Sequence, residues 1–93
     1  MEIRKITEGA KGYFVALDGE TEAGRMYFTN AGADKIIIDH TEVDDAFRGQ
    51  KVGQRILDEV VRFARENGIR IIPLCPFAKS VFDKTAEIRD VLF

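Results

Sequence analysis

The chain has 93 residues, 45% of them hydrophobic and 32% charged, a composition typical of a globular domain and not of a disordered or fibrous chain. One cysteine and one histidine exclude an internal disulfide and a four-ligand Cys/His metal site, and a net charge of −2 with a pI near 5.4 argues against nucleic-acid binding. Without an apolar run of ~20 residues or a signal-peptide core at Met1–Ile6, we expect a cytoplasmic domain spanning residues 1–93 that binds neither membrane nor metal.

The first half of the chain predicts four strands. Residues 2–6 alternate isoleucine with charge and suggest a short edge strand, and residues 13–17 are aromatic and β-branched. The Asp18-Gly19-Glu20 segment predicts a hairpin turn into a strand over residues 22–29. Residues 35–43 hold three consecutive isoleucines, and such a run suits a central strand that is covered on both faces.

The second half predicts a long amphipathic helix. Apolar residues recur at steps of three and four, which is the helical period. They are Val52, Ile56, Leu57, Val60, Val61, Phe63 and Ala64. Asn67-Gly68 ends the helix, because glycine readily adopts the left-handed conformation of a C-cap.

After the helix, residues 69–72 predict a strand that ends near Pro73, since proline cannot donate to a sheet ladder. Residues 77–84 predict a short helix with Phe77, Val81 and Phe82 turned inward, and the type of the apolar segment 87–93 is open. The order of these elements predicts a single domain of the α+β (mixed α/β) class.

The stretch Phe47–Gln54 lies between the isoleucine strand and the long helix. A helix start offers unpaired N–H groups and the positive end of the helix dipole, so it suits an anion. Gly49 and Gly53 leave room for close approach of a phosphate, and Arg48 and Lys51 add positive charge. On these residues alone, a glycine N-cap with surface cations is an equally good interpretation.

The same residues carry a resemblance. Ile36–Val43 followed by Phe47–Gly53 resembles the acyl-CoA-binding motif Arg/Gln-x-x-Gly-x-Gly/Ala of the GNAT superfamily of N-acetyltransferases, starting here at Arg48. With Ile71–Phe77 included, most of the chain is similar to the small single-domain GNAT-like proteins. The motif's middle glycine is Lys51 here.

The resemblance implies a mixed, mostly antiparallel central sheet whose two middle strands splay apart, with one long and one short helix. Acetyl-CoA would lie in the gap as co-substrate, with its pyrophosphate on the helix start and Val43 contacting the pantetheine arm through its backbone. The implied cofactor contacts are Arg48, Gly49, Gln50, Lys51, Val52, Gly53 and Gln54.

Acyl transfer from a thioester to an amine needs a deprotonated amine, a stabilised oxyanion and a proton for the departing thiolate. Histidine as a residue type suits proton transfer near neutral pH, so His40 is the candidate base, with Glu42 near enough to orient or replace it. An ordinary hydrogen-bonded strand histidine is the competing interpretation.

Cys75 stands between two prolines just past the predicted strand. It is a candidate proton donor to the coenzyme thiolate. As a nucleophile it would need its thiolate stabilised by a cation or a helix start, both of which Phe77–Lys79 could supply. A small buried hydrophobic residue is the third interpretation.

The sequence therefore predicts an acetyl-CoA-dependent N-acyltransferase in which a primary amine, on a small molecule or a protein, attacks directly in a ternary complex. The acidic first half, residues 1–45, favours a cationic acceptor such as a polyamine, an amino sugar or a lysine side chain. A non-catalytic acyl-CoA-binding or interaction module is the alternative, and a binder of another phosphate ligand is a third possibility. The sequence does not specify the acceptor or the oligomeric state.

Overall fold

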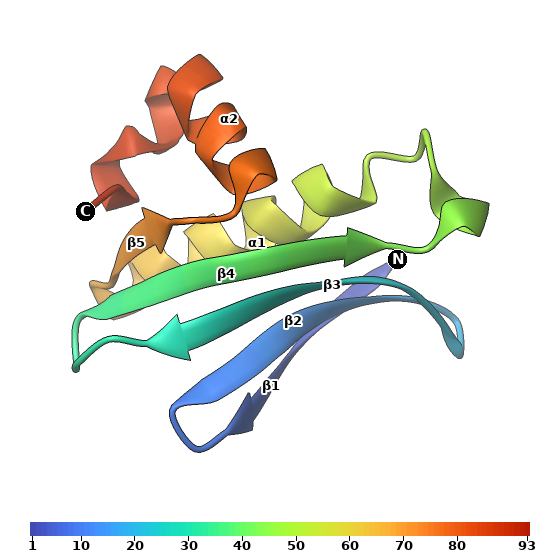
Figure 1. The fold of residues 1–93 in the computed structure, drawn as a ribbon, viewed down its shortest axis with the longest axis horizontal. Coiled ribbons are helices and arrows are strands. Elements are labelled where there is room, and N and C mark those ends of the chain that lie inside the picture. The colour runs from blue at the N-terminus through green and yellow to red at the C-terminus, as the bar shows by residue number, and fades with distance from the viewer.

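The structure, a computed structural model, describes residues 1–93. Its elements are β1 (Glu2–Glu8), β2 (Lys11–Asp18), β3 (Thr21–Asn30), β4 (Lys35–Val43), the 3-10 helix η1 (Asp45–Phe47), α1 (Val52–Asn67), β5 (Arg70–Pro73), α2 (Pro76–Lys84) and the 3-10 helix η2 (Ala86–Val91). The strands form one sheet in the order β1-β2-β3-β4-β5 (Figure 1). All neighbours are antiparallel except β4 and β5, which confirms the mixed, mostly antiparallel α+β fold.

The first four strands form a meander joined by tight turns. Gly19 turns the β2–β3 hairpin with a φ of 62°, a left-handed value that glycine adopts without a side-chain clash. The fourth strand has the predicted bounds, Lys35–Val43, and the other three extend one or two residues beyond them. Short-range pattern and turn chemistry were enough to predict this half of the fold.

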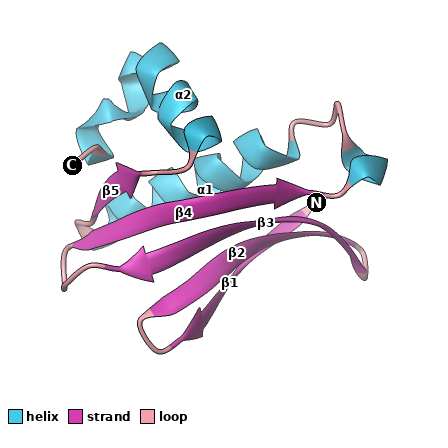
Figure 2. Ribbon diagram, in the orientation of Figure 1, coloured by secondary structure: helices cyan, strands magenta, loops and turns pink.

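One face of the sheet is covered by α1, which lies behind the strands in Figures 1 and 2. Side chains that alternate along the strands, such as Phe14, Phe28 and Ile36, pack there against the apolar stripe of α1. The opposite face of the first four strands carries partly exposed side chains, among them Tyr27 and Ile37. The expectation that the isoleucine strand is covered on both faces is therefore wrong, because no helix packs on the second face.

The C-terminal segment closes the β5 edge of the sheet. Gly68 caps α1 with a φ of 64° and donates its N–H to the Ala64 carbonyl, as predicted for the helix end. Arg65 of α1 holds η2 through two bonds to Asp90, of 2.9 and 2.8 Å. This guanidinium, chiefly through its hydrogen bond, lowers the pKa of Asp90 below its ordinary value.

The sheet opens between β4 and β5. The two strands pair only from Lys35↔Arg70 to Ile38↔Pro73, and the N–H groups of Leu74 and Cys75 then both bond to the Ile38 carbonyl. The chain turns away there and leaves the rest of β4 without a neighbour on that side. Since β5 is the last strand, the opening lies at the edge of the sheet. The resemblance had instead implied an opening between the two middle strands.

The short helix α2 buries Ala78 and Phe82 in the shared core, while Val81 is half-buried. Phe77, predicted to face inward, is instead 38% exposed because it lies at the first turn of α2 beside the opening of the sheet. No helix in the structure has both the length and the apolar character that crossing a membrane requires.

Candidate active site

A cleft of about 420 Å³ lies where β4 ends, η1 turns and α1 begins. Its walls come from four elements and the loop before α1. They are Thr41, Val43, Phe47, Arg48, Gly49, Lys51, Val52, Gly53 and Phe77. Five of the predicted cofactor contacts and Val43 are thus brought to one cleft, although they come from the end of a strand, a loop and the start of a helix.

The first turn of α1 is not capped by the protein. Lys51 is the N-cap and makes no side-chain capping bond, and the amides of Val52, Gly53 and Gln54 donate to no backbone or side-chain acceptor of the chain. The helix dipole adds partial positive charge at the same point. The result is a set of donors that favours an anion.

Lys51 has a left-handed backbone, with φ 59° and ψ 36°, and is the one non-glycine residue with positive φ. A residue with a Cβ pays for this conformation, which explains in backbone terms why the motif carries glycine here. Gly49 needs the same freedom, with a φ of 83° and nothing within 4 Å of its Cβ position.

We predict that Lys51→Gly stabilises the fold. Left-handed backbone costs an L-residue about 1–2 kcal/mol, and the extra freedom of unfolded glycine offsets up to about 1 kcal/mol, so a net gain of about 0.5–1 kcal/mol is expected. Urea unfolding measures it. Lys51→Ala removes the same ammonium but keeps the strain, so it should show no gain; equal stability of the two variants would contradict the argument.

The end of β4 presents a free backbone edge to the cleft. The Asp44 N–H donates to the carbonyl of Ala23 in β3 at 2.8 Å, so it points toward β3. Successive N–H groups of a strand point to opposite sides, which turns the amides of Val43 and Thr41 toward the gap. No strand pairs with them there, because β5 pairing ends at Ile38.

Two glycines allow close packing of the elements around the cleft. A Cβ on Gly53 would lie 3.0 Å from the Phe77 ring, so the absence of a side chain lets α2 approach α1. A Cβ on Gly24 of β3 would lie 2.6 Å from the Glu42 carbonyl oxygen and 3.2 Å from Val52, so Gly24 lets the start of α1 and the end of β4 lie close to β3. Substituting Gly53 would therefore disturb packing as well as any bound phosphate.

Cys75 lies at the N-cap of α2 and is only 3% exposed. Its Sγ is 3.1 Å from the Oγ1 of Thr41, a half-buried residue that lines the cleft. The thiol itself is not part of the cleft wall. The structure thus brings the cysteine to the opening of the sheet, behind Thr41.

His40 and Glu42 project from the other face of β4. Their side chains are 62% and 61% exposed, the His40 Nε2 lies 3.1 Å from the Glu42 Oε1, and the imidazole stacks on Tyr27 with ring centroids 6.1 Å apart. The structure pairs these two residues but does not bring them to Cys75, which lies on the side of β4 that faces α2.

Comparison with known proteins identifies the family of the chain. The family model of the GCN5-related N-acetyl-transferases matches residues 12–91. The chain belongs to the GCN5-related N-acetyltransferase family. It is accordingly an N-acetyltransferase, an enzyme of acyl transfer, and the resemblance seen in the sequence is confirmed.

A GCN5-like protein from Staphylococcus aureus, whose solution structure was determined by NMR, is 35% identical to this N-acetyltransferase. The alignment covers 99% of this chain and 87% of that one, with a TM-score of 0.72. No curated protein matches the chain at a significant level.

In this N-acetyltransferase three predicted cofactor residues stand at the rim of the cleft or outside it. The guanidinium of Arg48 pairs with Asp45 at 2.8 Å and is largely exposed. Gln50 is exposed on the loop, and Gln54 donates to Asp58 at 2.9 Å. The amides of Arg48 and Gln50 donate to the Asp45 and Phe47 carbonyls, whereas the Gln54 amide belongs to the uncapped first turn of α1.

Thr41, Phe47 and Phe77 line the cleft and were missed in the sequence. Thr41 could have been found, because it stands two residues from Val43 and a strand returns to the same face every second residue. Phe77 could not, since its place in the wall depends on how α2 packs against Gly53.

Proposed function

We propose that the protein transfers an acetyl group from acetyl-CoA to a primary amine that attacks directly in a ternary complex. The observation that carries the proposal is that the uncapped first turn of α1 and the unpaired edge of β4 face one cleft. Helix N-terminal amides suit a diphosphate. An unpaired strand edge suits the amide-containing pantetheine arm, which can bond to it as a further strand would.

The assignment of coenzyme contacts follows from that fit. The amides of Val52, Gly53 and Gln54 would hold the diphosphate, with Arg48 and Lys51 adding charge, and Val43 would bond the arm through its backbone. Phe77 offers an apolar surface at the mouth of the cleft. When bound, the coenzyme supplies the acetyl group as an activated thioester.

Two residues of the chain would carry the two proton transfers of the reaction. His40, oriented by Glu42, would take the proton of the amine directly or through water. Since these two side chains lie across β4 from the cleft, the amine would approach from the open face of the sheet and meet the thioester at the gap beyond Ile38. Cys75 would supply the proton for the departing sulfur, and its burial speaks against a role as nucleophile.

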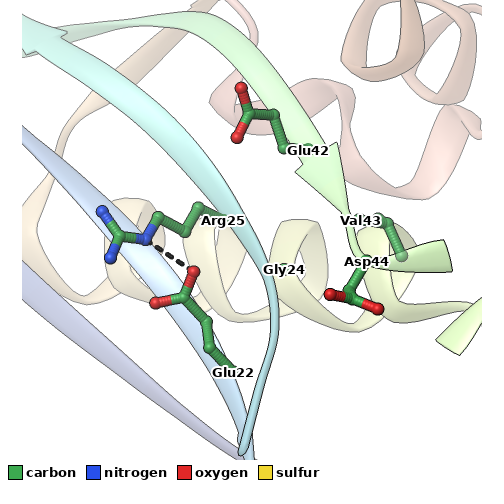
Figure 3. Close-up of a pocket in the computed structure, with 6 residues that line it drawn as sticks. All are labelled: Glu22, Gly24, Arg25, Glu42, Val43 and Asp44. Carbon is green, nitrogen blue, oxygen red and sulfur yellow. Dashed lines mark hydrogen bonds and ion pairs between the residues drawn. The ribbon is translucent and has the colours of Figure 1, made fainter. Parts of the chain in front are cut away.

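A cationic acceptor fits the surroundings of His40. A hollow of about 180 Å³ at the end of β4 is lined by Glu22, Glu42 and Asp44, together with Arg25 (Figure 3). Arg25 bonds to Glu22 at 2.8 Å, and that hydrogen bond holds the pKa of Arg25 above its ordinary value. The remaining carboxylates favour a positively charged amine, and a single unpaired cysteine suits the reducing cytoplasm.

Two measurements test the proposal. Calorimetry with acetyl-CoA should show binding, and release of free thiol over a panel of polyamines, amino sugars and lysine peptides should show turnover. We expect His40→Ala to lower kcat by about 10²-fold, which is the usual contribution of a general base. Cys75→Ala should lower kcat as well, while the KM for acetyl-CoA stays nearly constant.

Absence of acetyl-CoA binding would overturn the cofactor assignment. Binding without thiol release for any amine would favour the alternative, an acyl-CoA-binding module. Full activity in both variants would remove the roles given to His40 and Cys75. Glu8→Ala, an exposed residue at the β1–β2 turn and at the opposite end of the sheet from the end of β4, is a control that should leave binding and turnover unchanged.

A further inference from the structure

Thr41 is the polar side chain that stands between the cleft and the only thiol of the chain. It lies on β4 three residues beyond the last pair with β5, where the sheet has already opened. Its side chain lines the cleft, and its Oγ1 is 3.1 Å from the Cys75 Sγ. None of the roles assigned above uses this hydroxyl.

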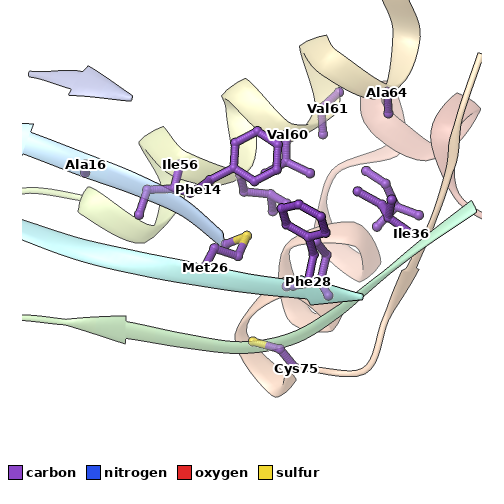
Figure 4. Close-up of a cluster of buried hydrophobic side chains, with 14 of the residues drawn as sticks. Phe14, Ala16, Met26, Phe28, Ile36, Ile56, Val60, Val61, Ala64 and Cys75 are labelled. Carbon is purple, nitrogen blue, oxygen red and sulfur yellow. The ribbon is translucent and has the colours of Figure 1, made fainter. Parts of the chain in front are cut away.

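Cys75 cannot serve the cleft by itself. It is 3% exposed and belongs to the buried cluster (Figure 4). Its backbone is fixed at both ends, because its N–H bonds to the Ile38 carbonyl at 3.0 Å and its carbonyl accepts the Lys79 N–H at 3.0 Å. The Thr41 hydroxyl is the polar group that lies between this sulfur and the cleft.

We propose that Thr41 relays the proton from Cys75 to the departing coenzyme sulfur, an inference that rests on the proposed function. A hydroxyl oxygen is a better acceptor than a thiol sulfur, so the Cys75 S–H donates to Thr41 Oγ1. The hydroxyl hydrogen of Thr41 is then free to point into the cleft. The Thr41 side chain thus accepts a hydrogen bond from Cys75 in the core and donates one to the coenzyme sulfur.

The step balances without a further reactant. As the amine adds to the thioester carbon and the C–S bond breaks, the Thr41 O–H gives its proton to the leaving thiolate. The Cys75 S–H proton moves to the Thr41 oxygen, which leaves a Cys75 thiolate that accepts a hydrogen bond from Thr41. The amine nitrogen loses one proton through His40 to solvent. Solvent later returns one proton to Cys75, so no proton is gained or lost overall.

Thr41→Val tests the relay, because valine keeps the shape and removes the hydroxyl. We expect kcat to fall about tenfold or more while the KM for acetyl-CoA changes less than twofold, and Thr41→Ser to restore most of kcat. Adding Cys75→Ala to Thr41→Val should lower kcat only slightly further, since the two residues act in the same proton path. Thr29→Val is the matched control: it removes a half-buried hydroxyl that bonds Asp39 on the open face.

A second readout does not depend on turnover. The chain has one cysteine, so the infrared S–H stretching band reports on Cys75 alone. An S–H that donates a hydrogen bond absorbs at lower frequency, so Thr41→Val should raise the frequency of the band and Thr29→Val should not.

The outcomes separate the two proposals. Unchanged kcat in Thr41→Val, or equal losses in the valine and serine variants, would overturn the relay while the acetyltransferase function stands. An S–H band that does not move would overturn the direction of the hydrogen bond and the relay with it. If the unmodified protein binds no acetyl-CoA, the proposed function fails and the relay fails as its consequence, whatever the S–H band shows.

Discussion

Lys51→Glu is expected to weaken acetyl-CoA binding at least about tenfold and to leave the fold as stable as before or slightly more stable. The carboxylate would stand at the uncapped start of α1, where it repels a diphosphate and removes a charge-assisted donor worth about 1.5–3 kcal/mol. The same carboxylate interacts favourably with the helix dipole, by about 0.3–1 kcal/mol. Calorimetry measures the first effect and urea unfolding the second.

Lys11→Glu is the matched control for this prediction. It makes the same change in net charge on an exposed residue at the start of β2, remote from the cleft. Its affinity for acetyl-CoA should remain within about twofold, because exposed charges are screened over roughly 10 Å at ordinary salt. Equal affinity of the two variants would show that the coenzyme does not lie on the start of α1.

Phe28→Ala is expected to destabilise the fold by about 3–5 kcal/mol, the usual cost of deleting a buried phenylalanine ring. Phe28 is 1% exposed, lies within the buried cluster of Figure 4, and has its ring centroid 5.5 Å from that of Phe14. It also fills the space over Gly12, where a Cβ would lie 2.7 Å from the Phe28 ring. Urea unfolding should show a large drop in the midpoint at nearly constant slope.

Phe93→Ala makes the same chemical change at a residue that is 70% exposed. It should alter the free energy of unfolding by no more than about 0.5 kcal/mol, as surface substitutions usually do. A loss below about 1 kcal/mol for Phe28→Ala would mean that the cluster relaxes to fill the space, contrary to the close packing described.

The sequence by itself determined most of the elements of this protein and the chemical character of its proposed anion site. The periods of two and 3.6 are local properties, as are the glycine turns at Gly19 and Gly68, so the strands and α1 could be read within a residue or two. The Arg48–Gly53 motif carried the family for the same reason, since its residues are neighbours in the chain.

The tertiary structure alone decided which faces are covered and which residues meet. Ile37 follows the same local pattern as its neighbours, and only the absence of a helix on the second face leaves it partly exposed. The Thr41–Cys75 contact joins positions 34 residues apart, and the Phe77–Gly53 contact depends on how α2 packs on α1. Such contacts depend on how distant segments pack together, which no local pattern specifies. They form part of the cleft wall and bring Cys75 behind Thr41.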